Sequence, residues 1–132
     1  MNERDETRLL FIKDGAELLL EMIEGCDLQG FLSDERTQLA VSMALITIGE
    51  YASRLSDDFK QENQDIKWRS ISDLRNIADH NYNGIRMEDI WEIATEDVPE
   101  LLEQVKGILR DGGVEGGIIT RSPVGDAFRK YQ

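Results

Sequence analysis

Residues 68–82 gather most of the side chains in this sequence that are able to do chemistry. The segment holds the chain's only histidine, and its polar members towards the end are Arg75, Asn76, Asp79, His80, Asn81 and Tyr82. A histidine titrates near neutral pH and can act as an acid or a base. An arginine stays protonated and can hold two phosphate oxygens in a planar fork. Taken singly, each also has a structural explanation: a helix cap, an ion pair of Arg75 with Asp79 one turn later, or a packed aromatic ring.

Helix geometry constrains how these side chains can act together. At about 100° per residue, Arg75 and His80 point roughly 140° apart on a regular helix. We therefore expect the helix to end or bulge between Asn76 and His80, or a cleft to collect residues from two chains. Glu50 is either buried beside a cation such as Arg69 or Arg75, or exposed.

The elements that must position this segment are helices. Apolar spacings of three and four residues predict helices over about 4–24, from a cap at Ser33 to near residue 56, over 66–80, over 87–96, and from 99 to 111. In the second helix, we expect the stripe of Leu39, Met43 and Ile46 to face inwards. The predicted fold is all-α, an antiparallel bundle of four or five helices. Residues 1–111 form this domain, and residues 112–132, with five of the eleven glycines, form a tail.

Composition excludes several classes of protein. The 132 residues suit one domain, one cysteine allows no intramolecular disulfide, and one histidine excludes a zinc site built from several His or Cys ligands of one chain. The sequence has no run of 18 apolar residues, and its charged start does not resemble a secretory signal, so we expect a cytoplasmic protein without a membrane anchor.

The net charge of −12 disfavours nucleic acid over most of the chain. Residues 1–65 carry a net charge of −9 and residues 87–132 a net charge of −5, whereas residues 66–86 carry a net charge of +2. Only this middle stretch favours a phosphate.

The spacing of Arg75, His80 and Tyr82 is R-x4-H-x-Y, which resembles the motif of the HEPN superfamily. More closely, the chain is similar to the HepT family (DUF86), the toxin half of HepT–MntA toxin–antitoxin systems. The elements that carry the resemblance are Ile48-Gly49-Glu50, Ile66-Lys67-Trp68, Asp89-Ile90-Trp91 and Glu96-Asp97-Val98-Pro99-Glu100-Leu101. Lys67 stands where the family commonly has proline. The likeness covers about residues 5–110.

This resemblance implies a dimer of helical bundles that acts as a metal-independent ribonuclease and needs no cofactor. It assigns catalysis to Arg75 and His80, in a cleft between protomers. It also implies a nucleotidyltransferase antitoxin as partner, which neutralises the toxin by attaching AMP to Tyr82.

The residue types suit that chemistry. Attack of a ribose 2′-hydroxyl on phosphorus needs a base, an acid and positive charge, and His80 and Arg75 supply these, with Asn76 and Asn81 as donors and Asp79 restraining the guanidinium. A scheme with two histidines requires a two-fold dimer, whereas a scheme with one histidine and Arg75 does not. Two alternatives remain open: a non-catalytic HEPN module that binds a nucleotide or a nucleotidyltransferase, and a purely structural helical adaptor.

Overall fold

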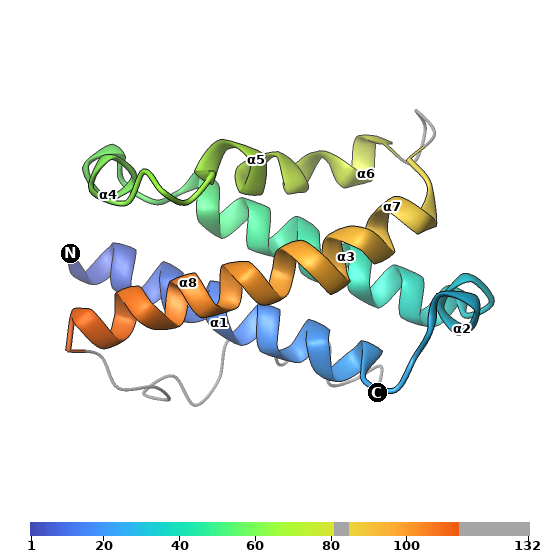
Figure 1. The fold of residues 1–132 in the computed structure, drawn as a ribbon. Helices are drawn as coiled ribbons and strands as arrows, with labels where there is room; N and C mark the ends of the chain where they lie inside the picture. Colours follow the sequence, from blue (N-terminus) through green and yellow to red (C-terminus); the bar gives the residue numbers. More distant parts are fainter. Residues whose placement is uncertain (81–84, 114–132) are drawn as a thin grey trace.

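The computed structural model describes residues 1–80 and 85–113, apart from the side chains of Asp79 and His80. These residues contain no strand, and four long helical segments run alternately in opposite directions (Figure 1). The segments are α1 (Glu3–Ile23); α3 (Glu35–Ser53); α5 (Trp68–Ser72) continued by η1 (Asp73–Asn76) and α6 (Ile77–His80); and α7 (Met87–Glu92) continued by η2 (Ile93–Asp97) and α8 (Val98–Asp111). Two short helices, α2 (Leu28–Leu32) and α4 (Asp57–Glu62), lie between them. The predicted antiparallel all-α bundle is confirmed.

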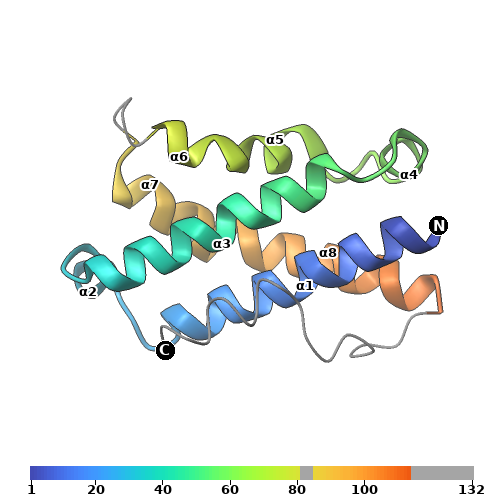
Figure 2. The ribbon, with the colours of Figure 1, turned by 180° about the vertical axis from the view of Figure 1, so that it is seen from behind.

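Helix α3 occupies the centre of the bundle. It packs against α1 on one side and against α5, η1 and α6 on the other, while α1 also packs against α8 (Figures 1 and 2). Large apolar side chains from α1, α2, α3, α7 and α8 are fully buried in this core, among them Leu9, Ile12, Phe31, Leu45, Ile48, Ile90 and Val105. The segment that contains Arg75 is thus an outer helix supported by α3.

The buried face of α3 differs from the predicted one. Leu39 and Met43 are 71% and 54% exposed, and Ile46 is only partly buried, so the predicted inward stripe is wrong. The core instead receives the opposite set of α3 side chains, which includes Leu45 and Ile48. Both sets have the same helical spacing. Which set is buried depends on the side of α3 against which α1, α5, η1 and α6 pack.

Helices α1 to α4 begin at residues that cap them, but the predicted cap of α3 at Ser33 is wrong. Asp34, and not Ser33, caps α3: its carboxylate accepts from the Thr37 backbone N–H at 3.2 Å and from the Thr37 hydroxyl at 2.6 Å. These hydrogen bonds lower the pKa of Asp34. Ser33 instead ends α2, where its hydroxyl donates to the Gln29 carbonyl.

A buried carboxylate joins the beginning of α1 to the start of α4. Asp5 is 1% exposed and accepts hydrogen bonds from the Ser56 backbone N–H at 2.9 Å and from its hydroxyl at 2.6 Å. The same hydroxyl oxygen caps α4 by accepting from the Phe59 N–H. The second long helix ends at Ser53, somewhat before the predicted residue 56, and the polar run after it contains α4.

The two helices predicted over 87–96 and 99–111 are continuous, because the π-helical turn η2 joins them. A proline inside an α-helix clashes with the carbonyl four residues earlier, which for Pro99 is that of Thr95. A π turn widens the backbone there, so the chain remains helical. Helix α8 ends at Asp111, as predicted, with Gly113 at φ 79° after it.

Residues 114–132 lie outside the described residues, so the interpretation of residues 112–132 as a tail stays a prediction. Among the described residues, no helix combines the length and the apolar composition needed to cross a lipid bilayer.

Candidate active site

Gly49 of α3 allows the motif segment to approach closely. A Cβ atom built on Gly49 would lie 2.5 Å from the backbone nitrogen of Arg75 and 3.1 Å from the carbonyl oxygen of Ile71. Any side chain at this position would therefore push η1 away from α3. The glycine of the Ile48-Gly49-Glu50 element fixes where the Arg75 backbone sits.

The aromatic residue Trp68 anchors the other end of the motif segment. Its indole N–H donates to the Asn63 carbonyl at 3.0 Å, and its ring packs on Phe59 with centroids 5.6 Å apart. Trp68 is 5% exposed, so the start of α5 is tied to the loop after α4. Contacts at Trp68 and at Gly49 hold the helix over the seven residues that lead to Arg75.

The helix departs from regular α geometry at Arg75 itself. Residues Asp73–Asn76 form a 3-10 turn, and the α-helix resumes over Ile77–His80. A break was predicted between Asn76 and His80, and that position is wrong by about one turn. A 3-10 turn is tighter than an α turn, which suits the close backbone contact with Gly49.

Arg75 is exposed, and no described side chain forms a hydrogen bond or salt bridge with it. Glu50 is not its partner. The Glu50 side chain is 44% exposed and its carboxylate lies 3.6 Å from the Arg54 guanidinium, so of the two predicted alternatives the exposed one is correct.

The remaining predicted site residues are described only in part. Asn76 is partly buried beside Arg75, and the backbones of Asp79 and His80 form the end of α6. Asn81 and Tyr82 lie outside the described residues, and so do any side-chain contacts of Asp79 and His80. The predicted roles of these five residues stay predictions.

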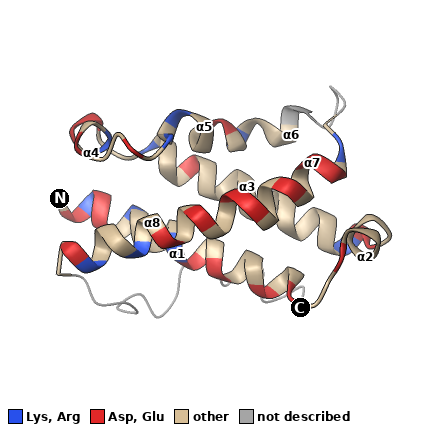
Figure 3. Ribbon diagram, in the orientation of Figure 1, with Lys and Arg blue, Asp and Glu red and all other residues tan. Residues whose placement is uncertain are grey.

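Basic side chains are exposed along the motif segment. Lys67, Arg69 and Arg75 are all exposed. Figure 3 shows basic positions in and just before α5, whereas acidic positions lie along α7 and α8. The local excess of positive charge seen in the sequence therefore lies on the surface, where a phosphate can reach it.

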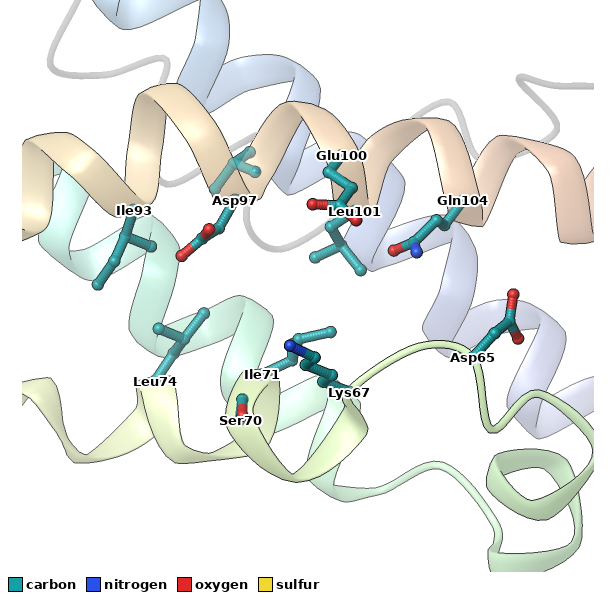
Figure 4. Close-up of a pocket in the computed structure, with 11 residues that line it drawn as sticks. Asp65, Lys67, Ser70, Ile71, Leu74, Ile93, Asp97, Glu100, Leu101 and Gln104 are labelled. Carbon is teal, nitrogen blue, oxygen red and sulfur yellow. The ribbon is translucent and has the colours of Figure 1, made fainter.

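The structure also contains a cavity that the sequence analysis missed. It has a volume of about 320 Å³ and lies between the motif segment and the η2–α8 helix (Figure 4). Its lining is Asp65, Lys67, Ser70, Ile71, Leu74, Ile93, Asp97, Val98, Glu100, Leu101 and Gln104. Asp97 and Leu101 belong to the Glu96–Leu101 element that carries part of the family resemblance, and this element was the one sequence signal that pointed to the cavity.

The cavity is chemically different from the Arg75 surface. Three carboxylates and one lysine surround an apolar floor, so its net charge disfavours a phosphate. Arg75 is not among the lining residues. Within the described parts of the chain, no three His, Cys, Asp or Glu side chains are grouped so that they could hold a metal ion.

Comparison with family models identifies the family of this chain. Residues 12–108 match the model of the family described as HepT-like, ribonuclease HepT-like, and the chain belongs to this family.

The matches between this chain and its relatives extend over most of the length of each relative. The chain is 32% identical over 107 residues to "Putative RNase MJ1380" of Methanocaldococcus jannaschii, which covers 80% of this chain and 98% of that protein. It is 34% identical over 90 residues to "Probable ribonuclease HepT" of Thermococcus cleftensis, covering 68% of this chain and 82% of that protein. It is 32% identical over 94 residues to "Putative RNase TTE0752" of Caldanaerobacter subterraneus, covering 71% and 84%. No solved structure matches the chain.

Proposed function

We propose that this protein is a metal-independent endoribonuclease, the toxin of a HepT–MntA type toxin–antitoxin pair that acts in the cytoplasm. The observation that carries the proposal is the exposed Arg75 on a 3-10 turn fixed by Gly49, in the segment that ends at His80. Membership of the ribonuclease HepT-like family and the names of the relatives support the same activity.

In the proposed reaction, the Arg75 guanidinium binds two non-bridging oxygens of an RNA phosphate. The ribose 2′-oxygen attacks phosphorus, its proton passes to a base, and the bond to the 5′-oxygen breaks as that oxygen takes a proton from an acid. His80 serves as base or acid, because an imidazole is poised near neutral pH. Asn76 and Asn81 donate hydrogen bonds or orient the imidazole, and Asp79 restrains Arg75.

A second copy of the chain completes the site in the two-histidine form of this scheme. One chain supplies one histidine, so a homodimer is needed for one imidazole to accept a proton while another donates one. We therefore include a homodimer in the proposal.

Regulation through Tyr82 follows from its position two residues after His80. A nucleotidyltransferase antitoxin of MntA type would attach AMP to the Tyr82 hydroxyl. The added phosphate would bring negative charge next to Arg75 and His80 and repel RNA from the site. Incubation with the cognate transferase and ATP, followed by intact-mass measurement, is expected to show AMP additions on wild type and none on Tyr82→Phe. Equal additions on both proteins would refute this part of the proposal.

A second candidate function is a non-catalytic module that binds a nucleotide or docks a nucleotidyltransferase. The net charge of −12 and the cavity with Asp65, Asp97 and Glu100 favour the docking form of this module, since such a surface suits a protein partner better than a nucleotide or RNA.

Induced expression of wild type, Arg75→Ala and His80→Ala separates these two functions. The ribonuclease proposal expects growth arrest and RNA fragmentation with wild type and neither with the variants. Circular dichroism checks that each variant is folded, and Arg75→Ala should keep the helical spectrum of wild type because Arg75 is exposed. If the folded variants arrest growth and fragment RNA as wild type does, the ribonuclease proposal is wrong. If wild type leaves RNA intact, the binding module is favoured.

A further inference from the structure

The cavity between the motif segment and the η2–α8 helix has apolar side chains on both of its walls (Figure 4). One wall carries Ile71 and Leu74, and the opposite wall carries Ile93, Val98 and Leu101. Both walls depart from α geometry, since Leu74 lies in the 3-10 turn η1 and Ile93 in the π-helical turn η2. Irregular turns inside helices are frequent at functional sites, so this cavity is a candidate binding site.

Unpaired carboxylates surround the apolar walls. Asp65, Asp97 and Glu100 are exposed lining residues, and Lys67 is the one basic residue among those that line the cavity. None of these four side chains forms a salt bridge or a hydrogen bond with another residue that the structure describes. Three carboxylates and one ammonium group give a local net charge of −2, so the cavity favours an occupant that joins cations to apolar groups.

One segment of this chain has that chemistry, and it lies outside the described residues. The sequence Phe128-Arg129-Lys130-Tyr131, here called the basic segment, places two adjacent cations between two aromatic rings. Residues 121–132 carry three basic side chains and one acidic side chain, a net charge of +2, whereas residues 1–120 carry a net charge of −14. Aromatic rings and arginines are also the side chains that most often anchor a docked segment.

The chain between α8 and the basic segment is long enough to reach the cavity. Gly113 has φ 79°, so the backbone leaves the direction of α8 there. Gln104 of the cavity wall lies about 14 Å back along the helix from Gly113, whereas the 15 residues up to Phe128 can span about 50 Å. A linker of this length keeps the segment at an effective concentration on the order of millimolar, which favours it over a separate weak partner.

We propose that the basic segment binds in this cavity of its own chain. The ring of Phe128 packs against the apolar walls, and Arg129 and Lys130 form ion pairs with the carboxylates at the rim. The docked segment then lies beside the candidate active site, because Leu74 of the cavity wall directly precedes Arg75.

Limited proteolysis of the full chain tests the docking. Trypsin cleaves after Arg129 and after Lys130, and docking should protect both bonds. The variant Asp97→Lys with Glu100→Lys reverses the charge at the rim of the cavity. Intact-mass measurement should show that its basic segment is cleaved about tenfold faster than that of wild type, because less of it is docked.

A matched variant controls for the change in net charge. Glu96→Lys with Glu103→Lys alters the charge by the same amount in the same helical segment, and both glutamates are exposed, but neither lines the cavity. Its basic segment should be cleaved at the wild-type rate. If the rim variant, the control and wild type were cleaved at one rate, the proposal would be wrong.

Disulfide trapping identifies the occupant of the cavity. In a Cys26→Ser background, Ala127→Cys is combined either with Gln104→Cys on the cavity wall or with Glu103→Cys, one position away and outside the cavity. Only the pair with Gln104→Cys should form a disulfide within one chain, seen as a monomer on a non-reducing gel that takes up no maleimide. Equal yields for the two pairs would overturn the proposal. A disulfide between two chains would also overturn it, because the occupant would then belong to another copy.

A charge swap tests whether the rim and the basic segment touch. Arg129→Glu with Lys130→Glu should lower the yield of the Gln104→Cys disulfide about tenfold. Addition of Asp97→Lys with Glu100→Lys should restore it, because the ion pairs re-form with reversed sign. A yield that stays low would show that another cation occupies the rim. None of these measurements uses RNA, so a chain that cleaves no RNA would refute the proposed ribonuclease activity and leave the docking standing.

Discussion

The backbone nitrogen of Arg75 lies 2.5 Å from the point that a Cβ atom on Gly49 would occupy. Gly49 is therefore the residue of α3 that sets the position of the motif arginine. Local sequence alone cannot reveal this, because 26 residues separate the two positions and the contact exists only after α3 and η1 have packed together.

Replacement of Gly49 by alanine should displace η1 and destabilise the protein. Forced overpacking of a methyl group against backbone costs about 1–3 kcal/mol in the free energy of unfolding. Urea unfolding followed by circular dichroism measures this. Gly107→Ala is the matched control: Gly107 lies inside α8, and a Cβ there meets nothing closer than 3.9 Å. It should stabilise the chain by about 0.5–1 kcal/mol. If Gly49→Ala were as stable as Gly107→Ala, the close contact would not exist in solution.

The buried Asp5 carboxylate and Ser56 should be energetically coupled. Asp5→Ala leaves the Ser56 N–H and hydroxyl without their acceptor, and a buried polar group without a partner costs about 1–3 kcal/mol. A double-mutant cycle of Asp5→Ala and Ser56→Ala by urea unfolding should give a coupling energy above about 0.5 kcal/mol. Strictly additive effects would contradict the two hydrogen bonds.

The helix cap at Asp34 predicts a pH-dependent contribution to stability. Hydrogen bonds from Thr37 lower the pKa of Asp34 below its ordinary value of 3.8, so the folded state favours the charged carboxylate. Its contribution is present above about pH 3.8 and is lost as the pH falls through the lowered pKa. Asp34→Asn keeps a capping side chain but not the charge, so wild type should exceed it in stability at pH 7, with the difference shrinking below about pH 3.8. A difference independent of pH would show that the charge does not contribute.

Periodicity was sufficient to predict the bundle, but not which side of each helix faces inwards. The first helix, the helical motif segment and the end of the last helix at Asp111 are confirmed. The interpretation of α3 failed because Leu39, Met43 and Ile46 repeat with the same spacing as the buried residues. Apolar spacing cannot distinguish a face of α3 that α1 and α5 cover from a face that is exposed to solvent.

Smaller errors have equally local causes. Ser33 and Asp34 are adjacent cap formers, and the geometry of the turn after α2 decides between them. In the sequence, a π turn that joins two helices has the same apolar pattern as two helices separated by a break before Pro99. The spacing of apolar residues therefore could not predict that the two helices are continuous. The cavity beside η2 was missed because its lining residues come from segments about 30 residues apart.

The central claim is that Arg75 and His80 act on one RNA phosphodiester. Cleavage of a defined RNA by the purified full chain in EDTA tests it directly, with Arg110→Ala, an exposed arginine on α8, as matched control. We expect wild type and Arg110→Ala to cleave equally, and His80→Ala to be slower by about 100-fold or more. Arg75→Lys should also be strongly impaired, because lysine keeps the charge but loses the fork. Cleavage by His80→Ala and Arg75→Lys at the wild-type rate would contradict the account.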